Sequence, residues 1–245
     1  MARQDVNGNS APARQATRLP SWKRMLDLAV IVALAPGLLI LGGAVALLVM
    51  CGSRGPVFFR QRRVGYKGRE FDLFKFRTMQ VDAETQSHRD HFLMLMERDV
   101  PMIKLDARRD PRLVPFGALL RATGLDELPQ LINVVRGEMS IVGPRPCIPY
   151  EYARYKPWQR RRLDAFPGLT GLWQVNGKNR TTFNEMVRLD IEYSKRVSLW
   201  FDLKIMWRTL PALWQQCVDL RERTRRQTGR SSSVGMTRSA ESYHL

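Results

Sequence analysis

The chain has 245 residues, of which 44% are hydrophobic and 26% are charged, so it can bury one good-sized core, or a core with a small membrane element. Its formal net charge of +17 requires an anionic partner, and the candidate classes are nucleic acid, acidic lipid headgroups and a phosphorylated substrate. Three cysteines far apart, without a CxxC pair, support neither a disulfide framework nor a zinc knuckle, and they predict reduced, cytoplasm-facing thiols.

Both ends of the chain are basic and poor in large apolar residues. Residues 1–24 carry five basic side chains against one acid, and residues 221–245 carry six against two. This composition predicts disordered basic tails at 1–20 and 219–245. Between them we expect a membrane segment at 21–53 and one folded domain at 54–218.

An uncharged apolar segment follows the first tail. Leu28–Cys51 contains 24 residues without a charge, which meets the roughly 20-residue length of a membrane helix. Basic residues flank it on both sides, Lys23 and Arg24 before it and Arg54 after it, and such flanks favour the cytoplasmic side. Pro36 removes a backbone donor and is expected to bend the helix. These residues leave open a kinked spanning helix and a re-entrant helix that returns to the same face.

The rest of the chain predicts short strands and helices. In chain order we expect a strand hairpin of 57–60 and 70–76, helices at 80–98, around 119–120 and from about 126 to 135, and short strands at 140–143 and 172–175. With segregated short strands and no internal repeat, the class that we predict is α+β.

A second apolar pattern lies near the C-terminal end. A stripe recurs at steps of three and four through Trp200, Leu203, Trp207, Leu210 and Trp214. Tryptophan favours the interface between membrane and water, but the core of a soluble helix would give the same stripe, so both interpretations remain open. Pro211 is expected to kink or end this helix.

The adjacent acids Asp126 and Glu127 are the main candidates for chemistry. They lie between Gly124 and Pro129, at an expected helix start, where a carboxylate interacts favourably with the helix dipole. On its own, the pair is explained more readily by a helix N-cap at Asp126 than by catalysis. The two histidines at 88 and 91 have no further ligand cluster with them and are expected on the surface.

Basic residues around the acid pair favour phosphate chemistry. Arg121 precedes the pair, Lys75 and Arg77 end a strand, and Arg145 stands in a GPRP sequence whose prolines stiffen the backbone. Arginine grips phosphate oxygens with two donors at once. Carboxylates surrounded by such basic residues can hold Mg²⁺, or one of them can attack phosphorus to form a covalent acyl-phosphate.

Several blocks together resemble a known family, the monotopic phosphoglycosyl transferases, which begin bacterial exopolysaccharide, O-antigen and glycoprotein glycan assembly. The blocks, in order, are KRMLDL, FFRQRRVGYKGREFDLFKFRTM, LLRATGLDELPQLINVVRGEMSIVGPRP, PGLTGLWQVNGKNR, LDIEYS and WFDLKIMWRTL. They extend from about Ser21 to Trp214. The chain differs from the common pattern at Gly124, where relatives often carry serine.

The resemblance implies a reaction and roles for individual residues. Asp126 would be the nucleophile on the sugar-bearing phosphorus of a UDP-sugar, and Glu127 its partner for metal or proton handling, with Mg²⁺ as cofactor. UMP would leave, and undecaprenyl phosphate would then take the phosphosugar. The helix break would lie at Pro36 in a re-entrant membrane helix. The residues expected to bind phosphates or the nucleotide are Lys75, Arg77, Arg121, Gln130, Pro144, Arg145, Pro146 and Asp190.

The expected partners are therefore a UDP-sugar, undecaprenyl phosphate and inner-membrane lipid, with the catalytic domain facing the cytoplasm. Nucleic acid is not an expected partner, because no RNA- or DNA-binding motif is present. The oligomeric state is left open, a homodimer included. The competing hypotheses are a nucleic-acid binder, a catalytically silent scaffold and a glycosyltransferase that releases UDP.

Overall fold

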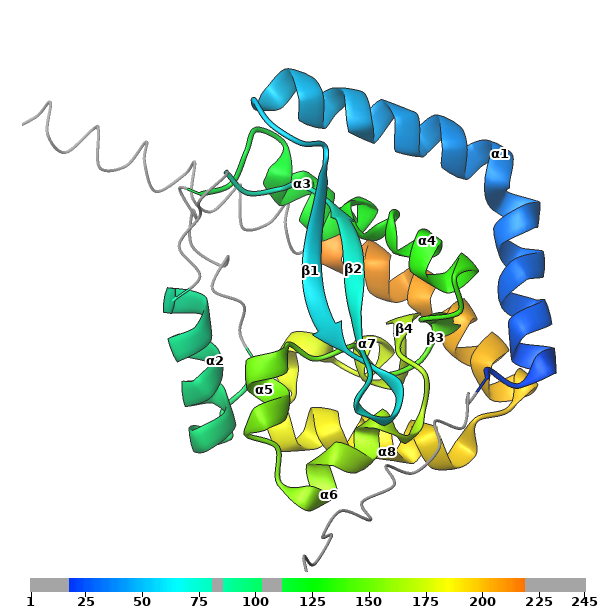
Figure 1. The fold of residues 1–245 in the computed structure, drawn as a ribbon, viewed down its shortest axis with the longest axis vertical. Helices are drawn as coiled ribbons and strands as arrows, with labels where there is room; N and C mark the ends of the chain where they lie inside the picture. Colours follow the sequence, from blue (N-terminus) through cyan, green and yellow to red (C-terminus); the bar gives the residue numbers. More distant parts are fainter. Residues whose placement is uncertain (1–17, 81–85, 103–111, 219–245) are drawn as a thin grey trace, which may run out of the picture.

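The computed structural model describes residues 18–80, 86–102 and 112–218. The tails expected at 1–20 and 219–245 lie outside these ranges, apart from residues 18–20. Within them, helices surround two separate two-stranded sheets (Figure 1). The α+β class is therefore confirmed.

The apolar segment forms one long helix, α1, which spans Ser21–Gly52. It is long and apolar enough to cross a membrane, and side chains in its middle are strongly exposed, with Leu39 at 76% and Ile40 at 77%. The ribbon bends part-way, so that one arm runs beside the domain and the other over one end of it (Figure 1). Pro36 lies inside the helix, and proline is a common cause of such a bend.

Both arms of α1 pack on the same folded body. In the first arm, Lys23 is buried and forms an ion pair with Asp202, which is also buried. In the second arm, Val45 and Val49 are buried in a cluster with Phe76. The two ends of this helix therefore contact one domain.

The first sheet is a hairpin through the centre of the molecule (Figure 1). Strands β1 (Phe58–Val64) and β2 (Glu70–Phe76) pair antiparallel along their whole length. The 3-10 turn η1 (Tyr66–Gly68) joins them, with Lys67 in the left-handed region. The second strand has the bounds that we predicted, whereas the first, expected at 57–60, is longer because it stays paired up to the turn.

Among the described residues, four helical segments lie between the first sheet and the second. They are α2 (Gln86–Arg98), α3 (Gly117–Thr123), the 3-10 turn η3 (Leu125–Glu127) and α4 (Gln130–Val135). The helix expected from 126 to 135 is thus two elements. Pro129 separates them, because it has no N–H to donate to the carbonyl of Leu125. That carbonyl instead accepts from the N–H of Leu128, which gives a tighter 3-10 turn.

The second sheet pairs β3 (Ser140–Val142) with β4 (Gly168–Thr170) in parallel, so the expected hairpin arrangement holds for the first sheet alone. The chain crosses between these strands through α5 (Pro149–Ala153), α6 (Pro157–Arg160) and the 3-10 turn η4 (Arg161–Asp164). The backbones approach closely where β3 ends. A Cβ at Gly143 would lie 2.1 Å from the carbonyl oxygen of Phe166, so only glycine fits there.

The prediction of a strand at 172–175 is wrong, because these residues form helix α7 (Leu172–Val175). Strand pairing ends at Thr170, and the helical turn directs Trp173 inward. The indole N–H of Trp173 then donates to the Thr181 hydroxyl at 2.7 Å. This bond ties α7 to the segment after the 3-10 turn η5 (Lys178–Arg180).

Two helices complete the domain. Helix α8 (Phe183–Arg196) begins with a capping box between Thr182 and Glu185, and its buried face includes Phe183 in the main apolar cluster. The last described helix covers residues 199–218 and continues through Pro211, so it does not end there, while a kink at Pro211 stays a prediction. Its tryptophan stripe is not core, since the exposed fractions are 79% for Trp200, 77% for Trp207 and 71% for Trp214.

Candidate active site

The acid pair lies on a tight turn between two short helices. Gly124 ends α3 in the left-handed region, at a φ of 74°, and the chain then forms η3 with Asp126 and Glu127 in it. The residues at the N-cap positions of η3 and α4 are Gly124 and Pro129, so Asp126 does not cap either helix. The alternative explanation from the sequence, that Asp126 is a helix N-cap, is therefore wrong.

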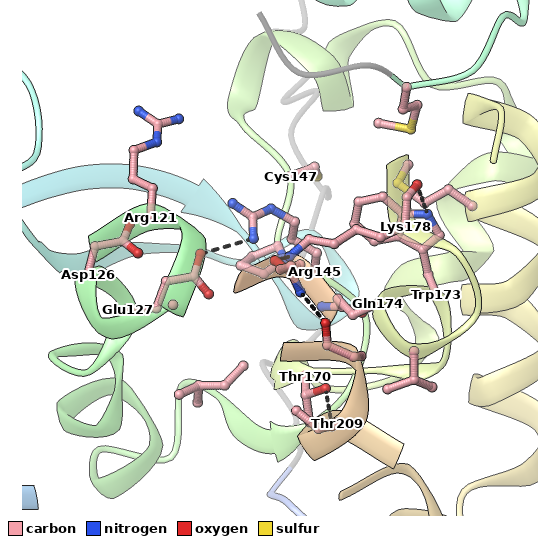
Figure 2. Close-up of a pocket in the computed structure, with 18 of the residues that line it drawn as sticks. Arg121, Asp126, Glu127, Arg145, Cys147, Thr170, Trp173, Gln174, Lys178 and Thr209 are labelled. Atoms are coloured by element: carbon pink, nitrogen blue, oxygen red, sulfur yellow. Dashed lines mark hydrogen bonds and ion pairs between the residues drawn. The ribbon is translucent and has the colours of Figure 1, made fainter. Parts of the chain in front are cut away.

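Both acids line one pocket of about 430 Å³. Side chains from distant parts of the chain complete it, and Figure 2 shows them around a common space. The polar residues on the walls include Lys75, Arg121, Arg145, Gln174 and Lys178. Residues 209–216 of the last helix form a further wall, so the pocket lies beside the helix that carries the exposed tryptophans.

Glu127 is held between two cations. Its Oε1 accepts from Lys75 Nζ at 3.0 Å and from Arg145 Nη1 at 3.2 Å, and Figure 2 shows the second contact across the pocket. Burial acts to raise the pKa of Glu127, but the charges of Lys75 and Arg145 outweigh it and hold the pKa well below its usual range. Glu127 is therefore ionised at neutral pH and fixes both cations in place.

Asp126 has the opposite electrostatic environment. Its side chain is buried, and that burial raises its pKa above the ordinary value, against the opposing charge of Lys75. The neighbouring negative charge of Glu127 adds to the rise. A carboxylate with a raised pKa is more basic, and hence a better nucleophile once it is ionised.

The geometry therefore combines one buried carboxylate of raised pKa with a set of cations. Two acids whose pKa values are pushed apart can take different roles in one reaction. The cations facing them can neutralise phosphate oxygens as charge develops on them. The arrangement suits nucleophilic attack on a phosphorus atom.

The comparison with known families agrees with this geometry. A family model described as bacterial sugar transferase matches residues 18–216. The chain belongs to this family. The transferase thus matches its family over both the apolar helix and the domain that carries the pocket.

Relatives of the transferase extend the match to curated proteins. Galactosyl transferase CpsE of Streptococcus agalactiae serotype III (strain NEM316) is 44% identical over 191 residues, which cover 77% of this chain and 41% of CpsE. Exopolysaccharide production protein ExoY of Sinorhizobium fredii (strain NBRC 101917 / NGR234) is 37% identical over 199 residues, which cover 79% of this chain and 84% of ExoY.

A third relative carries the reaction in its name. UDP-glucose:undecaprenyl-phosphate glucose-1-phosphate transferase of Caulobacter vibrioides (strain ATCC 19089 / CIP 103742 / CB 15) is 40% identical over 202 residues, which cover 78% of this chain and 69% of that protein. The match therefore spans less than half of CpsE and more than two thirds of the other two relatives.

The pocket brings together part of the predicted site of the transferase. Of the predicted residues, those that line it are Lys75, Arg121, Asp126, Glu127, Arg145 and Pro146. The structure puts Pro144 in the same loop as Arg145, and Gln130 is buried at the start of α4. Neither of these two is among the residues that line the pocket.

Two predicted ligands of the transferase have other partners. Arg77 is buried and donates to the backbone oxygens of Ser53 at 2.8 Å and Arg54 at 3.0 Å, so it fastens the chain just after α1. Asp190 is fully buried and forms an ion pair with Arg162 at 2.6 Å. Asp190 reaches the pocket through Arg162, which is one of the lining residues.

Several lining residues were not predicted from the sequence. Arg63, Arg162, Trp173, Gln174 and Lys178 all face the pocket. Trp173, Gln174 and Lys178 fall in PGLTGLWQVNGKNR, a block that carried the family resemblance. Their place in this block could have identified them as candidate site residues. His91, expected on the surface, lies on the pocket wall as well.

A divalent metal could be held by few protein groups in the transferase. Among the described residues there is no group of three or more histidines, cysteines or acids arranged around a common point. Mg²⁺ does not require one, because it commonly binds through one or two carboxylates together with substrate phosphates. Asp126 faces the pocket and accepts no hydrogen bond from the described residues, so it fits this kind of site, with Glu127 beside it.

Proposed function

We propose that the enzyme transfers a sugar-1-phosphate from a UDP-sugar to undecaprenyl phosphate, as the first membrane step of an exopolysaccharide or O-antigen type glycan. The names of the relatives support the general reaction. The pocket supports it in chemical terms, because it pairs an acid suited to attack with cations suited to a diphosphate. The observation that carries the proposal is the geometry of the pocket, in which Asp126 lies beside Glu127 while Glu127 accepts from Lys75 at 3.0 Å and from Arg145 at 3.2 Å.

In the first step, a carboxylate oxygen of Asp126 attacks the sugar-bearing phosphorus. A bond forms between that oxygen and phosphorus, and the bond from phosphorus to the bridging oxygen breaks. UMP leaves with the electron pair, and the phosphosugar stays on Asp126 as an acyl-phosphate. Lys75 and Arg145, oriented by Glu127, lie where they can bind the diphosphate oxygens.

In the second step, an oxygen of undecaprenyl phosphate attacks the same phosphorus. The bond from phosphorus to Asp126 breaks, which frees the carboxylate and gives the polyprenyl-diphosphate sugar. Mg²⁺ held by Asp126 and Glu127 together with the diphosphate would supply charge neutralisation. Pro146 and Arg121, which line the pocket, are proposed to contact the nucleotide.

The membrane arrangement that we propose is a re-entrant α1 with the domain on the cytoplasmic face of the inner membrane. It is supported by the contacts of both arms of α1 with one domain, through Lys23 at one end and Val49 at the other. The exposed tryptophans of residues 199–218 would lie at the membrane interface. The pocket next to them would then open close to the headgroup region, where undecaprenyl phosphate presents its phosphate.

The covalent scheme is tested with Asp126→Asn. Purified enzyme is incubated with a panel of UDP-sugars and undecaprenyl phosphate, and the released nucleotide and lipid product are identified. We expect UMP from the wild type and a loss of turnover on the order of 10³-fold or more in the variant, because an amide cannot form the acyl-phosphate. The variant's melting temperature checks its fold.

Two results would contradict the proposal. Release of UDP in place of UMP would indicate an ordinary glycosyltransferase. Turnover in Asp126→Asn, or a trapped wild-type enzyme with labelled phosphosugar on another residue, would refute the role of Asp126.

A further inference from the structure

Donors outside the loop that carries Arg145 form hydrogen bonds to the backbone carbonyls of that loop. The carbonyl of Pro144 accepts from the N–H of Gly168 at 2.9 Å. The carbonyl of Arg145 accepts from Arg162 Nη2 at 3.1 Å, and that of Pro146 from Arg63 Nη1 at 3.1 Å. Three successive carbonyls of the loop are therefore fixed from outside it.

Arg162 is the most deeply buried of these donors. Its side chain is 2% exposed, and it forms an ion pair with Asp190 at 2.6 Å. Its Nη1 donates to the Tyr155 hydroxyl at 2.7 Å, while its Nη2 donates to the Arg145 carbonyl. Protein groups thus engage both terminal nitrogens of the guanidinium, while its Nε has no hydrogen-bond partner among the described residues, although the side chain borders the substrate pocket.

A buried charge of this kind is costly unless it is paired and its donors are used. The three partners of Arg162 come from α8, from the segment after α5 and from the loop itself, so they fix its position from separate elements. Burial of the paired carboxylate is equally complete, since Asp190 is 0% exposed. The buried ion pair of Arg162 and Asp190 therefore gives the loop backbone a donor whose position is fixed.

The contacts continue into the pocket. Arg162 holds the backbone of Arg145, and the side chain of Arg145 donates to Glu127 at 3.2 Å. A shift of the loop would move the Arg145 guanidinium relative to Glu127 and to the phosphates that it is proposed to bind. Misplacement of about 1 Å can cost an enzyme on the order of 10²-fold in rate.

We propose that Arg162, anchored by Asp190, is a positioning residue that fixes Arg145 for the transfer step. This rests on the proposed function of the pocket. Asp190 then serves the site without touching substrate. Arginine is needed because the two terminal nitrogens of one guanidinium donate to Tyr155 and to the Arg145 carbonyl while its charge pairs with Asp190. The single ammonium group of a lysine does not match this geometry.

The test is a double-mutant cycle with Arg162→Lys and Arg145→Ala, read by the rate of UMP release at saturating substrates. We expect Arg162→Lys alone to lower the rate about 10- to 100-fold. In the Arg145→Ala background the same change should cost less than about 3-fold, because the group that it positions has gone. Arg161→Lys is the matched control, since Arg161 is adjacent but exposed, and it should leave the rate unchanged.

Asp190→Asn provides a second route if Arg162→Lys does not fold. It nearly keeps the shape of the side chain, and it should show the same dependence on Arg145. A loss that persists in full in the Arg145→Ala background would overturn the positioning role, because a general effect on folding adds to that of Arg145→Ala. Absence of UMP from the wild type would instead refute the proposed function, so the two failures are distinguishable.

Discussion

Asp126 and Glu127 are neighbours in the chain, yet their surroundings separate them chemically. Lys75 and Arg145 both contact Glu127, so its charge is compensated and its pKa falls. Asp126 is buried beside a carboxylate that is already ionised, and its pKa rises. In the mechanism that we propose, ionisation of Asp126 therefore limits the reaction at low pH, while that of Glu127 does not.

This difference predicts an acid limb in the pH profile of turnover. The reactive form is the ionised carboxylate, so activity is present above the pKa of Asp126 and is lost as pH falls through it. Because that pKa is raised, the loss should begin at a higher pH than for an ordinary aspartate, whose pKa is about 3.9. The measurement is the rate of UMP release at saturating substrates as the pH is lowered from about 8.

Two other titratable groups need controls in this experiment. Burial raises the pKa of Asp190 to about 6, against the charge of Arg162, and His91 lies on the pocket wall. The acid limb should persist in Asp190→Asn and in His91→Asn, with circular dichroism confirming the fold at each pH. A wild-type rate that stays constant down to about pH 4 would contradict the raised pKa of Asp126.

At the scale of the element, α1 is fastened to the domain at its first arm by a buried polar cluster. Lys23 pairs with Asp202, whose other oxygen accepts from the Tyr193 hydroxyl at 2.8 Å. One turn on, Asp27 accepts from the Ser140 hydroxyl and from the backbone N–H of Ile141, both at 3.0 Å. These bonds join α1 to β3 and to the last helix, which fixes the direction in which α1 leaves the domain.

The ion pair predicts a stability effect that depends on charge. Lys23→Met should destabilise the protein by about 3–5 kcal/mol, because it leaves the Asp202 carboxylate buried without a cation. The double variant Lys23→Met with Asp202→Asn should recover most of that loss, since the amide oxygen can still accept from Tyr193. Thermal unfolding in detergent measures both. Equal destabilisation of the single and double variants would show that the buried charge is not the cause.

At the scale of the whole molecule, large apolar side chains are exposed on two segments that are distant in the sequence. The middle of α1 exposes Leu39 and Ile40, and the last described helix exposes Trp207 and Trp214. In the re-entrant arrangement that we propose, the contacts of both arms with the domain keep the two ends of α1 on one side of the membrane. The basic residues on both flanks of α1 agree with a cytoplasmic location for each end.

This arrangement predicts the topology of the full chain. Tags at the N- and C-termini should both resist protease added outside intact spheroplasts, and both should be cleaved in inverted membrane vesicles. Pro36→Leu should release part of the population into a spanning form, because a straight helix of 32 residues is long enough to cross the bilayer. A C-terminal tag cleaved from outside in the wild type would contradict the re-entrant arrangement.

The sequence alone determined the local features of this protein. The uncharged run marked α1, alternation of apolar residues marked β2, and the blocks around Asp126 and Arg145 identified the family, because each of these signals is contained within a short stretch of chain. The strand predicted at 172–175 failed for the same reason, since the inward turn of Trp173 depends on Thr181, which lies outside that stretch.

Only the tertiary structure decided which residues line the pocket and which contact other protein groups outside it. Arg77 and Asp190 belong to blocks that carry the family resemblance, as most of the pocket residues do, yet they bind the end of α1 and Arg162, respectively. Arg162 faces the pocket 36 positions after Asp126, brought there by the crossover between β3 and β4. Burial and long-range pairing set these roles and the opposite pKa shifts, and both depend on contacts between segments that sequence spacing does not specify.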